Sequence, residues 1–62
     1  MDLLKVGKFL KALREEKGIT QVQLSRKLVE DGGYSDALIS KWERGESLPN
    51  IEDLKKLGYY FG

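Results

Sequence analysis

Apolar residues recur along this chain at the spacing of an α-helix, and glycine or proline interrupts the pattern before any segment becomes long. Gly18, the Gly32–Gly33 pair, Gly45 and Pro49 mark the interruptions. Short amphipathic helices of this kind are not stable alone, because nucleating a helix is costly and packing supplies most of its stability. The sequence therefore predicts an all-α fold, in which four short helices form a compact bundle.

The second, third and fourth predicted helices begin at Thr20, Ser35 and Asn50, whose side chains can accept hydrogen bonds from the free N–H groups of a first turn. Gly18 is well placed to end the first helix. With 62 residues, the whole chain is expected to form a single domain, residues 1–62. The predicted helices run from Asp2 or Leu3 to Lys17, from Thr20 to about Val29, from Ser35 to Arg44, and from Asn50 onward.

One face of each helix is expected to be buried against the others, at positions three and four residues apart. The predicted core consists of Leu3, Val6, Phe9, Leu10 and Leu13 in the first helix, Leu24 and Leu28 in the second, Ile39 and Trp42 with Leu38 at their margin in the third, Ile51, Leu54, Leu57 and Phe61 in the fourth, and Leu48 from the preceding loop.

The composition disfavours an enzyme or a metal site. The chain has no cysteine and no histidine, which removes the thiolate ligand, the commonest metal ligand and the commonest general base. The carboxylate pairs Glu15–Glu16, Glu30–Asp31 and Glu52–Asp53 are sequence neighbours, and neighbouring side chains diverge on a helix. We expect no cofactor, no small-molecule substrate and no catalytic activity.

The charges are divided unevenly along the chain. Residues 1–27 carry seven basic and three acidic side chains, whereas residues 28–62 carry four basic and seven acidic, and the net charge is +1. This asymmetry is compatible with a polyanionic partner, and equally with ordinary solvated helix faces. No apolar run reaches the length of a membrane span and no signal peptide is recognisable, so a cytoplasmic protein is expected.

The outer face of the predicted third helix has a composition that suits DNA. Ala37, Ser40, Lys41 and Arg44 point away from the predicted core, small residues first and cationic residues last. A major groove accepts an α-helix; small side chains allow close approach, and Lys or Arg can reach guanine. The alternative is that this is an ordinary exposed helix face.

A second feature of the third helix is an acid on its inner side. Glu43 projects within roughly 40° of Ile39 around the helix, and an unpaired carboxylate there would be costly. Arg14 lies at the edge of the apolar stripe of the first helix and is the natural partner. The sequence predicts an Arg14–Glu43 ion pair that joins the two helices, unless Glu43 reaches solvent.

Two blocks of sequence resemble the phage repressor/Cro-type helix-turn-helix family, named for xenobiotic-response-element regulators. They are L-R-x-x-K-G-I-T-Q at Leu13–Gln21 and I-S-K-W-E-R-G at Ile39–Gly45, and Pro49 follows at the usual distance. Members of this family contain a buried ion pair like the one predicted here. The resemblance implies a sequence-specific DNA-binding repressor or regulator that works as a homodimer on a palindromic operator in double-stranded DNA.

The resemblance also assigns roles to individual positions. It implies that helix 35–44 lies in the major groove while the helix before it crosses the backbone. The implied phosphate and backbone contacts are Gln21, which would also brace the third helix, Ser35, Arg44, Glu46 and Ser47, and the implied base-reading residues are Asp36, Ala37 and Lys41, with Ser40 as a secondary candidate. Asp36 could accept from cytosine or only favour the helix dipole.

The chain departs from the family pattern in the turn before the third helix. The segment between Leu28 and Ser35 is about four residues longer than the common tight turn. We expect Val29 to extend the second helix, and Gly32 and Gly33 to permit a left-handed exit. Three other departures are Ser25 where alanine is usual, Val29 where glycine is usual, and an acidic Glu46 where a basic residue is common.

Two alternatives to this interpretation remain open from the sequence. The same fold could present Leu38, Val22 and Tyr34 to a protein partner, as an antitoxin or accessory factor would. The chain could also be a designed or truncated fragment that lacks the part responsible for dimerisation. Tyr59 and Tyr60 lie off the predicted core face of the last helix, and are either dimer contacts or aromatic surface.

Overall fold

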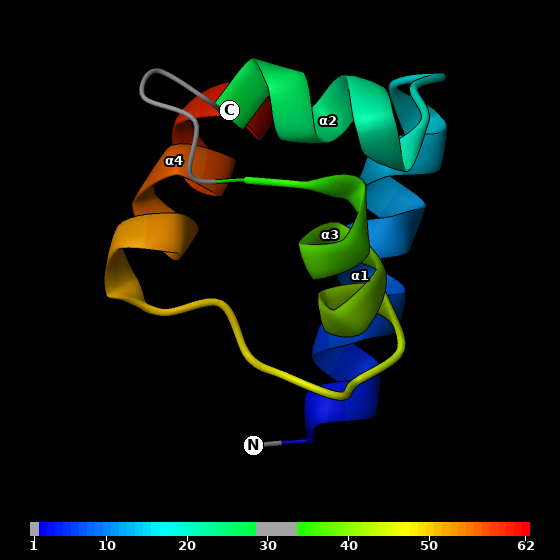
Figure 1. Ribbon diagram of the computed structural model, residues 1–62, viewed down its shortest axis with the longest axis vertical. Coiled ribbons are helices and arrows are strands. Elements are labelled where there is room, and N and C mark those ends of the chain that lie inside the picture. Colours follow the sequence, from blue (N-terminus) through cyan, green and yellow to red (C-terminus); the bar gives the residue numbers. More distant parts are fainter. Residues whose placement is uncertain (1, 29–33) are drawn as a thin grey trace.

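The structure is a computed structural model that describes residues 2–28 and 34–62. The described part of the chain contains four α-helices, which confirms the all-helical fold predicted from the periodicity. Its Cα radius of gyration is 10.5 Å. The helices are α1 (Leu3–Glu16), α2 (Gln21–Leu28), α3 (Asp36–Glu43) and α4 (Ile51–Phe61), arranged as in Figure 1.

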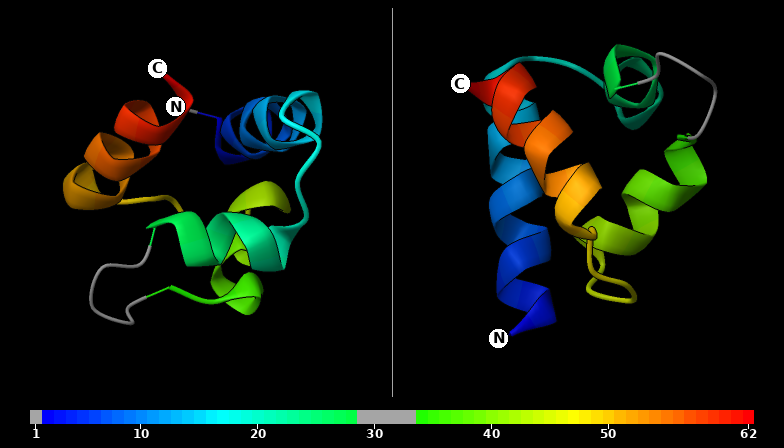
Figure 2. Two further views of the ribbon diagram at one scale, coloured as in Figure 1. Left: turned by 90° about the horizontal axis from the view of Figure 1, so that it is seen from above. Right: turned by 90° about the vertical axis from the view of Figure 1, so that its left-hand side faces the viewer.

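The longest helix, α1, forms one side of the molecule, and α2 lies across its C-terminal end (Figure 1). Helix α3 packs against both α1 and α2, while α4 closes the opposite side of the core (Figure 2). The C-terminal ends of α1 and α4 meet, since Lys17 Nζ lies 5.5 Å from the ring centroid of Tyr60. This arrangement of the helices leaves α3 at the surface, with its inner side packed against α1 and α2.

Side-chain caps begin the helices at the residues that the sequence predicted. The Ser35 hydroxyl accepts from the Leu38 amide at 3.2 Å, and Thr20 and Gln23 bond each other's backbone amides reciprocally. Asn50 and Asp53 form the same reciprocal arrangement, a capping box, at the start of α4. These bonds satisfy N–H groups that a helix cannot satisfy internally, so they define where each helix starts.

Two glycines allow helices to end or to approach closely. Gly18 has a φ of 70° directly after α1, as expected for the residue that ends this helix. Gly7 lies within α1, where an added Cβ would come within 2.4 Å of the Trp42 carbonyl oxygen. The backbone of α1 therefore touches the last turn of α3, and only glycine permits this contact.

The core consists of Leu10, Leu24, Leu28, Ile39, Trp42 and Leu57. The prediction that Phe9 is buried was wrong, because its side chain is 63% exposed, and Leu3 is also exposed. The reason is the contact at Gly7, which turns a different arc of α1 inward. Phe9 lies about 160° from Gly7 around the helix.

The predicted buried face of α4 was also partly wrong. Ile51 and Leu54 are exposed, and Leu48 is exposed while the neighbouring Pro49 is fully buried. Leu57 is the buried centre of this helix, and Ile51 lies roughly 120° away from it. Tyr60, expected off the core face, instead packs against the core with Phe61.

The expected roles of Val29, Gly32 and Gly33 in the turn before α3 concern residues outside the described ranges.

Within the described ranges, none of the helices has the length and apolar character needed to cross a membrane. The same residues contain no cluster of acidic side chains suited to a metal ion.

Candidate nucleic-acid interface

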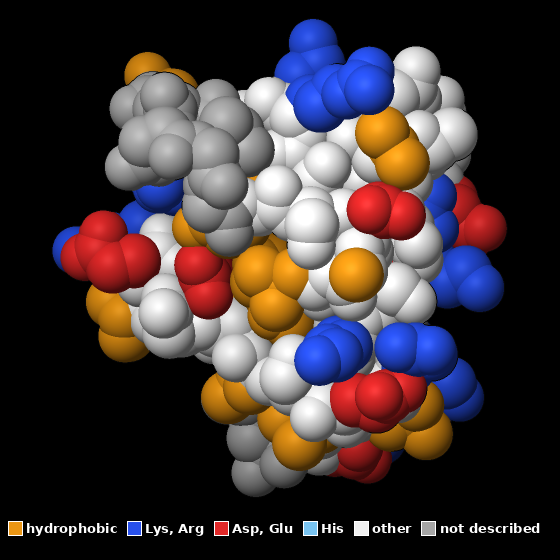
Figure 3. All heavy atoms as spheres, viewed as in Figure 1, with side chains coloured by type: hydrophobic (Ala, Val, Ile, Leu, Met, Phe, Trp, Pro, Cys, Tyr) orange, Lys and Arg blue, Asp and Glu red, His pale blue; other side chains and the backbone are white. Residues whose placement is uncertain are grey.

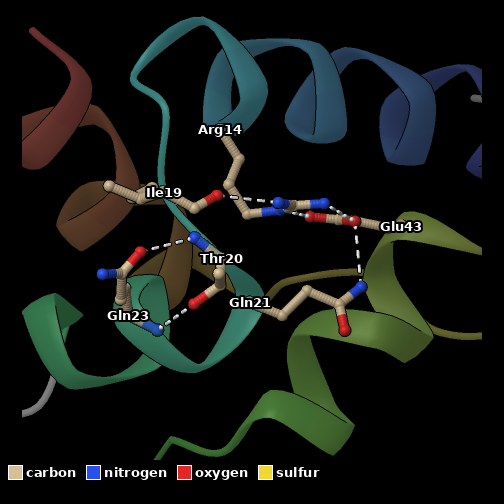
Figure 4. Close-up of polar contacts among 6 residues, drawn as sticks. All are labelled: Arg14, Ile19, Thr20, Gln21, Gln23 and Glu43. Carbon is tan, nitrogen blue, oxygen red and sulfur yellow. Dashed lines mark hydrogen bonds and ion pairs between the residues drawn. The ribbon is translucent and has the colours of Figure 1, made fainter.

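Arg14 of α1 and Glu43 of α3 meet in a two-point ion pair (Figure 4). Arg14 Nε donates to Glu43 Oε2 at 2.6 Å, and Arg14 Nη2 donates to Glu43 Oε1 at 3.0 Å. The two side chains are only 11% and 4% exposed. The pair that the helical periodicity predicted is thus present and shielded from water, and the alternative of a solvated Glu43 does not hold.

Two further bonds extend this pair into α2. Arg14 Nη1 donates to the Ile19 carbonyl oxygen at 2.8 Å, which fixes the turn between α1 and α2. Gln21 Nε2, at the start of α2, donates to Glu43 Oε1 at 3.1 Å (Figure 4). One carboxylate on α3 is therefore held from two other helices, and this holds the end of α3 in place.

The surroundings keep both groups charged. Burial on its own raises the pKa of Glu43, but bonds from Arg14 and Gln21, with the charges of Arg14 and Lys11, outweigh it and lower that pKa below its ordinary value. The bond to Glu43 raises the pKa of Arg14 above its ordinary value, against the opposing effect of burial. A buried charge pair is stable here because its hydrogen bonds are satisfied.

The opposite side of α3 faces solvent. Its exposed residues are Asp36, Ala37 and Lys41, and Ser40 is partly buried. Ser35 at the N-cap and Arg44 at the C-cap are also exposed. The order of side chains along this face is acidic, small, polar and then cationic, as read from the sequence.

The charges on this side of the molecule are grouped. Figure 3 shows positive side chains over α2 and again over the end of α3 and the following loop, with acidic side chains beside the second group. Arg26 and Lys27 belong to the last turn of α2, and Lys41 to that of α3. This side of the molecule therefore carries a mixture of charges, with one group of cations on α2 and another at the end of α3.

Two residues that the resemblance placed near phosphates have unexpected surroundings. Arg44 Nε lies 2.8 Å from Glu46 Oε2, in an exposed ion pair. The hydroxyl oxygen of Ser47 is buried and has no hydrogen-bond partner among the described residues. Ser47 would have to rotate its side chain to reach a phosphate, and Arg44 would meet a phosphate with part of its charge already offset by Glu46.

Tyr34 makes a link that the sequence did not reveal. Its hydroxyl donates to Asp53 Oδ1 at 2.6 Å, and its ring lies edge-on to Trp42 with centroids 6.0 Å apart. Lys56 Nζ lies 5.1 Å from the centroid of the same ring. Tyr34 therefore joins the start of α3 to α4, in addition to packing against the core.

Comparison with known proteins agrees with this geometry. A family of proteins described as helix-turn-helix matches residues 10–62. The HTH-type transcriptional activator BcrR of Enterococcus faecalis is 42% identical over 52 residues, which cover 84% of this chain and 24% of that protein. The chain thus spans about a quarter of the length of this relative. No solved structure matches the chain.

The family match covers the second half of α1 and all of α2, α3 and α4. Arg14 and Glu43 both lie within the matched residues. The sequence similarity to the activator BcrR extends over most of this chain. The family match agrees with the all-helical fold of the described residues. The chain therefore belongs to the Cro/C1-type (xenobiotic-response-element) helix-turn-helix family, whose members are DNA-binding transcription regulators and not enzymes.

Proposed function

We propose that this protein binds double-stranded DNA sequence-specifically by inserting α3 into the major groove. The observation that carries the proposal is the contrast between the two sides of α3. Glu43 on the inner side is held by Arg14 and Gln21, while the outer side is exposed and small at its centre. A rigid helix with a small, polar outer face meets the steric requirement of groove entry.

The proposed contacts fall into two groups. Residues that read base edges come from the exposed face of α3, and residues that meet the phosphates flank it. Ser40 is partly buried and is a secondary reader. The proposed readers are Asp36, Ala37 and Lys41, with Ser40 in second place, and the proposed backbone contacts are Gln21, Ser35, Arg44 and Ser47.

Gln21 is proposed to have two roles. Its amide nitrogen carries two hydrogens, of which one is directed to Glu43. The second hydrogen remains available for a phosphate oxygen. The bond to Glu43 would therefore orient the Gln21 amide towards the DNA backbone. Gln21 is partly exposed at the first position of α2, where the positive end of the helix dipole also attracts a phosphate.

Selection of bound sites from a random DNA pool tests the proposal. We expect the wild-type protein to enrich one sequence, and Lys41→Ala to change the enriched sequence at a single position, with a loss of about 1–3 kcal/mol on the original site. Gln21→Ala should weaken binding to all sequences alike. If neither variant alters binding, α3 is not the reading helix.

The working form is proposed to be a homodimer on a palindromic operator, since symmetric dimers place two reading helices one DNA turn apart. Repression is the regulatory outcome that the family resemblance implies for the sequence, whereas the relative from Enterococcus faecalis is named an activator. A reporter gene carrying the selected operator decides the sign: expression falls for a repressor and rises for an activator. Cytoplasmic location follows from the proposed DNA target and is part of the same proposal.

The rival function, a protein-binding module, has less surface than the sequence suggested. Leu38 and Tyr34 pack against the core, and of the three proposed contact residues only Val22 is exposed. Binding to DNA should weaken steeply as salt is raised, whereas an apolar protein interface should not. Measuring the salt dependence of partner binding therefore separates the two functions.

A further inference from the structure

The turn that ends α3 holds a carboxylate directly beside the last cation of the proposed reading helix. Arg44 Nε and Glu46 Oε2 are 2.8 Å apart, and both side chains are more than half exposed, at 58% and 53%. Arg44 is the C-cap of α3. The guanidinium that is proposed to meet a phosphate therefore has an anionic partner before any DNA arrives.

The backbone of this turn is tightly determined. Gly45 has a φ of 75°, and an added Cβ would lie 3.0 Å from the Cα of Leu4 in α1. The Glu46 amide donates to the Lys41 carbonyl oxygen at 2.9 Å. Arg44 and Glu46 are thus both anchored to the last turn of α3, two positions apart around a glycine that no other residue can replace easily.

Stability gives little reason for an acid at this place. An exposed ion pair contributes little to stability, because solvent screens it and ordering two side chains costs entropy. A negative charge near the C-terminal end of a helix is also opposed by the helix dipole. Glu46 therefore has its main electrostatic effect on whatever approaches Arg44 from solvent.

We propose that Glu46 acts as an internal competitor of the DNA backbone: it pairs with Nε of Arg44 in the free protein and so offsets the charge that Arg44 can offer to a phosphate. This proposal rests on the DNA-binding function proposed above and adds a residue that sets its strength. The carboxylate carries a negative charge and acceptor oxygens, as a phosphate does, and a guanidinium is attracted to both. DNA affinity is then limited by the intramolecular pair.

The test measures binding to a fluorescently labelled duplex of about 20 base pairs, the length that spans two half-sites. One duplex carries the sequence recovered by selection and a second carries a random sequence. Glu46→Gln should bind both about two- to fivefold more tightly, the size expected for releasing one exposed ion pair. The slope of log affinity against log salt should become more negative by about one, because one more phosphate is neutralised.

A double-variant cycle separates competition from simple charge repulsion. In an Arg44→Gln background, Glu46→Gln should have no further effect on affinity or on salt slope. Glu52→Gln removes the same charge from an exposed position on α4 and should leave the salt slope unchanged. Urea unfolding should give the same stability for the wild type and for Glu46→Gln, so that tighter binding is not an effect of folding.

The outcomes distinguish the two proposals. If the wild type binds neither duplex, both the DNA-binding function and the role of Glu46 are overturned. If the wild type binds and Arg44→Gln weakens binding while Glu46→Gln has no effect, the function stands and Glu46 is not a competitor. If Glu46→Gln tightens binding equally in the Arg44→Gln background, the effect is general repulsion and the competition is refuted.

Discussion

At the scale of single residues, the Arg14–Glu43 pair is the most consequential contact in the molecule. It joins helices that are far apart in the sequence, and Gln21 and the Ile19 carbonyl oxygen complete the hydrogen bonds around it. Removing one partner from a buried pair leaves the other charge uncompensated, which costs more than the pair itself contributes. In a domain of this size the total stability is small, so the effect should be easy to measure.

Arg14→Met is expected to lower the free energy of unfolding by about 3–5 kcal/mol, because Glu43 would remain buried without a partner. The double variant Arg14→Met/Glu43→Leu should recover most of the loss, since it removes both charges and keeps an apolar contact. Urea denaturation followed by circular dichroism measures both values. An Arg14→Met protein as stable as the wild type would show that the pair does not hold the helices together.

Acid should destabilise the protein through Glu43. Because the pKa of Glu43 is lower in the folded protein than its ordinary value of 4.5, its contribution to stability is complete above that value. The contribution is lost as the pH falls below 4.5 and through the lowered folded pKa. We expect the unfolding free energy to fall over this range in the wild type and to fall less in Glu43→Gln.

The control for the acid titration is Glu16→Gln, which changes an exposed carboxylate at the end of α1. This variant should keep the acid sensitivity of the wild type. Equal acid sensitivity in Glu43→Gln and the wild type would mean that other carboxylates cause the loss of stability at low pH.

At the scale of helices, the contact between α1 and α3 depends on the absence of a side chain at Gly7. Its missing Cβ lets the backbone of α1 approach the carbonyl oxygens of Trp42 and Glu43. This approach brings Arg14, two turns further along the same side of α1, into reach of Glu43. The position of α3, the proposed reading helix, therefore depends on a glycine in another helix.

Gly7→Ala and Gly58→Ala should change stability in opposite directions. An alanine at position 7 would clash with the backbone of α3 and should cost about 1–3 kcal/mol. An alanine at position 58 meets nothing within 4 Å and should stabilise α4 by about 0.5–1 kcal/mol, because glycine is a poor helix former. Thermal unfolding of both variants checks this, and a harmless Gly7→Ala would argue against the close packing of α1 on α3.

The start of α4 is also connected to α3. One carboxylate oxygen of Asp53 accepts from the Asn50 amide, and the other accepts from the Tyr34 hydroxyl. A residue that appears from the sequence to be only a capping acid thus also ties the start of α3 to α4. The capping bond of Asp53 can be predicted from the sequence because it is local. The bond from Tyr34 could not be predicted, because it depends on which residues lie opposite Asp53 in the fold.

At the scale of the whole molecule, the proposed dimer needs an exposed surface that is not part of the core. Tyr59 is 92% exposed, whereas Tyr60 packs against Phe61 and the core, so of these two tyrosines Tyr59 is the candidate for the dimer contact. Phe9, on α1, is the matching exposed aromatic residue at another place on the surface.

Sedimentation velocity over a series of protein concentrations tests the dimer. The wild type and Phe9→Lys should show a concentration-dependent dimer, and Tyr59→Lys should remain monomeric because a charge would be buried at the interface. A wild-type protein that stays monomeric at all concentrations would contradict the dimer. Equal dimerisation by Tyr59→Lys and the wild type would place the interface elsewhere.

The amino-acid sequence by itself determined the helices and the ion pair. Apolar spacing, N-cap residues and Gly18 depend on interactions within a few positions, so the four helices could be predicted from them. Arg14 and Glu43 could be paired because a buried carboxylate requires a partner. Tertiary structure decided which arc of each helix is buried: Gly7 turned Phe9 outward, and the packing of Leu57 left Ile51 exposed. The spacing of apolar residues predicts which side of a helix is buried, but not which residues on that side lie deepest. The close packing of a neighbouring backbone decides which of them are buried.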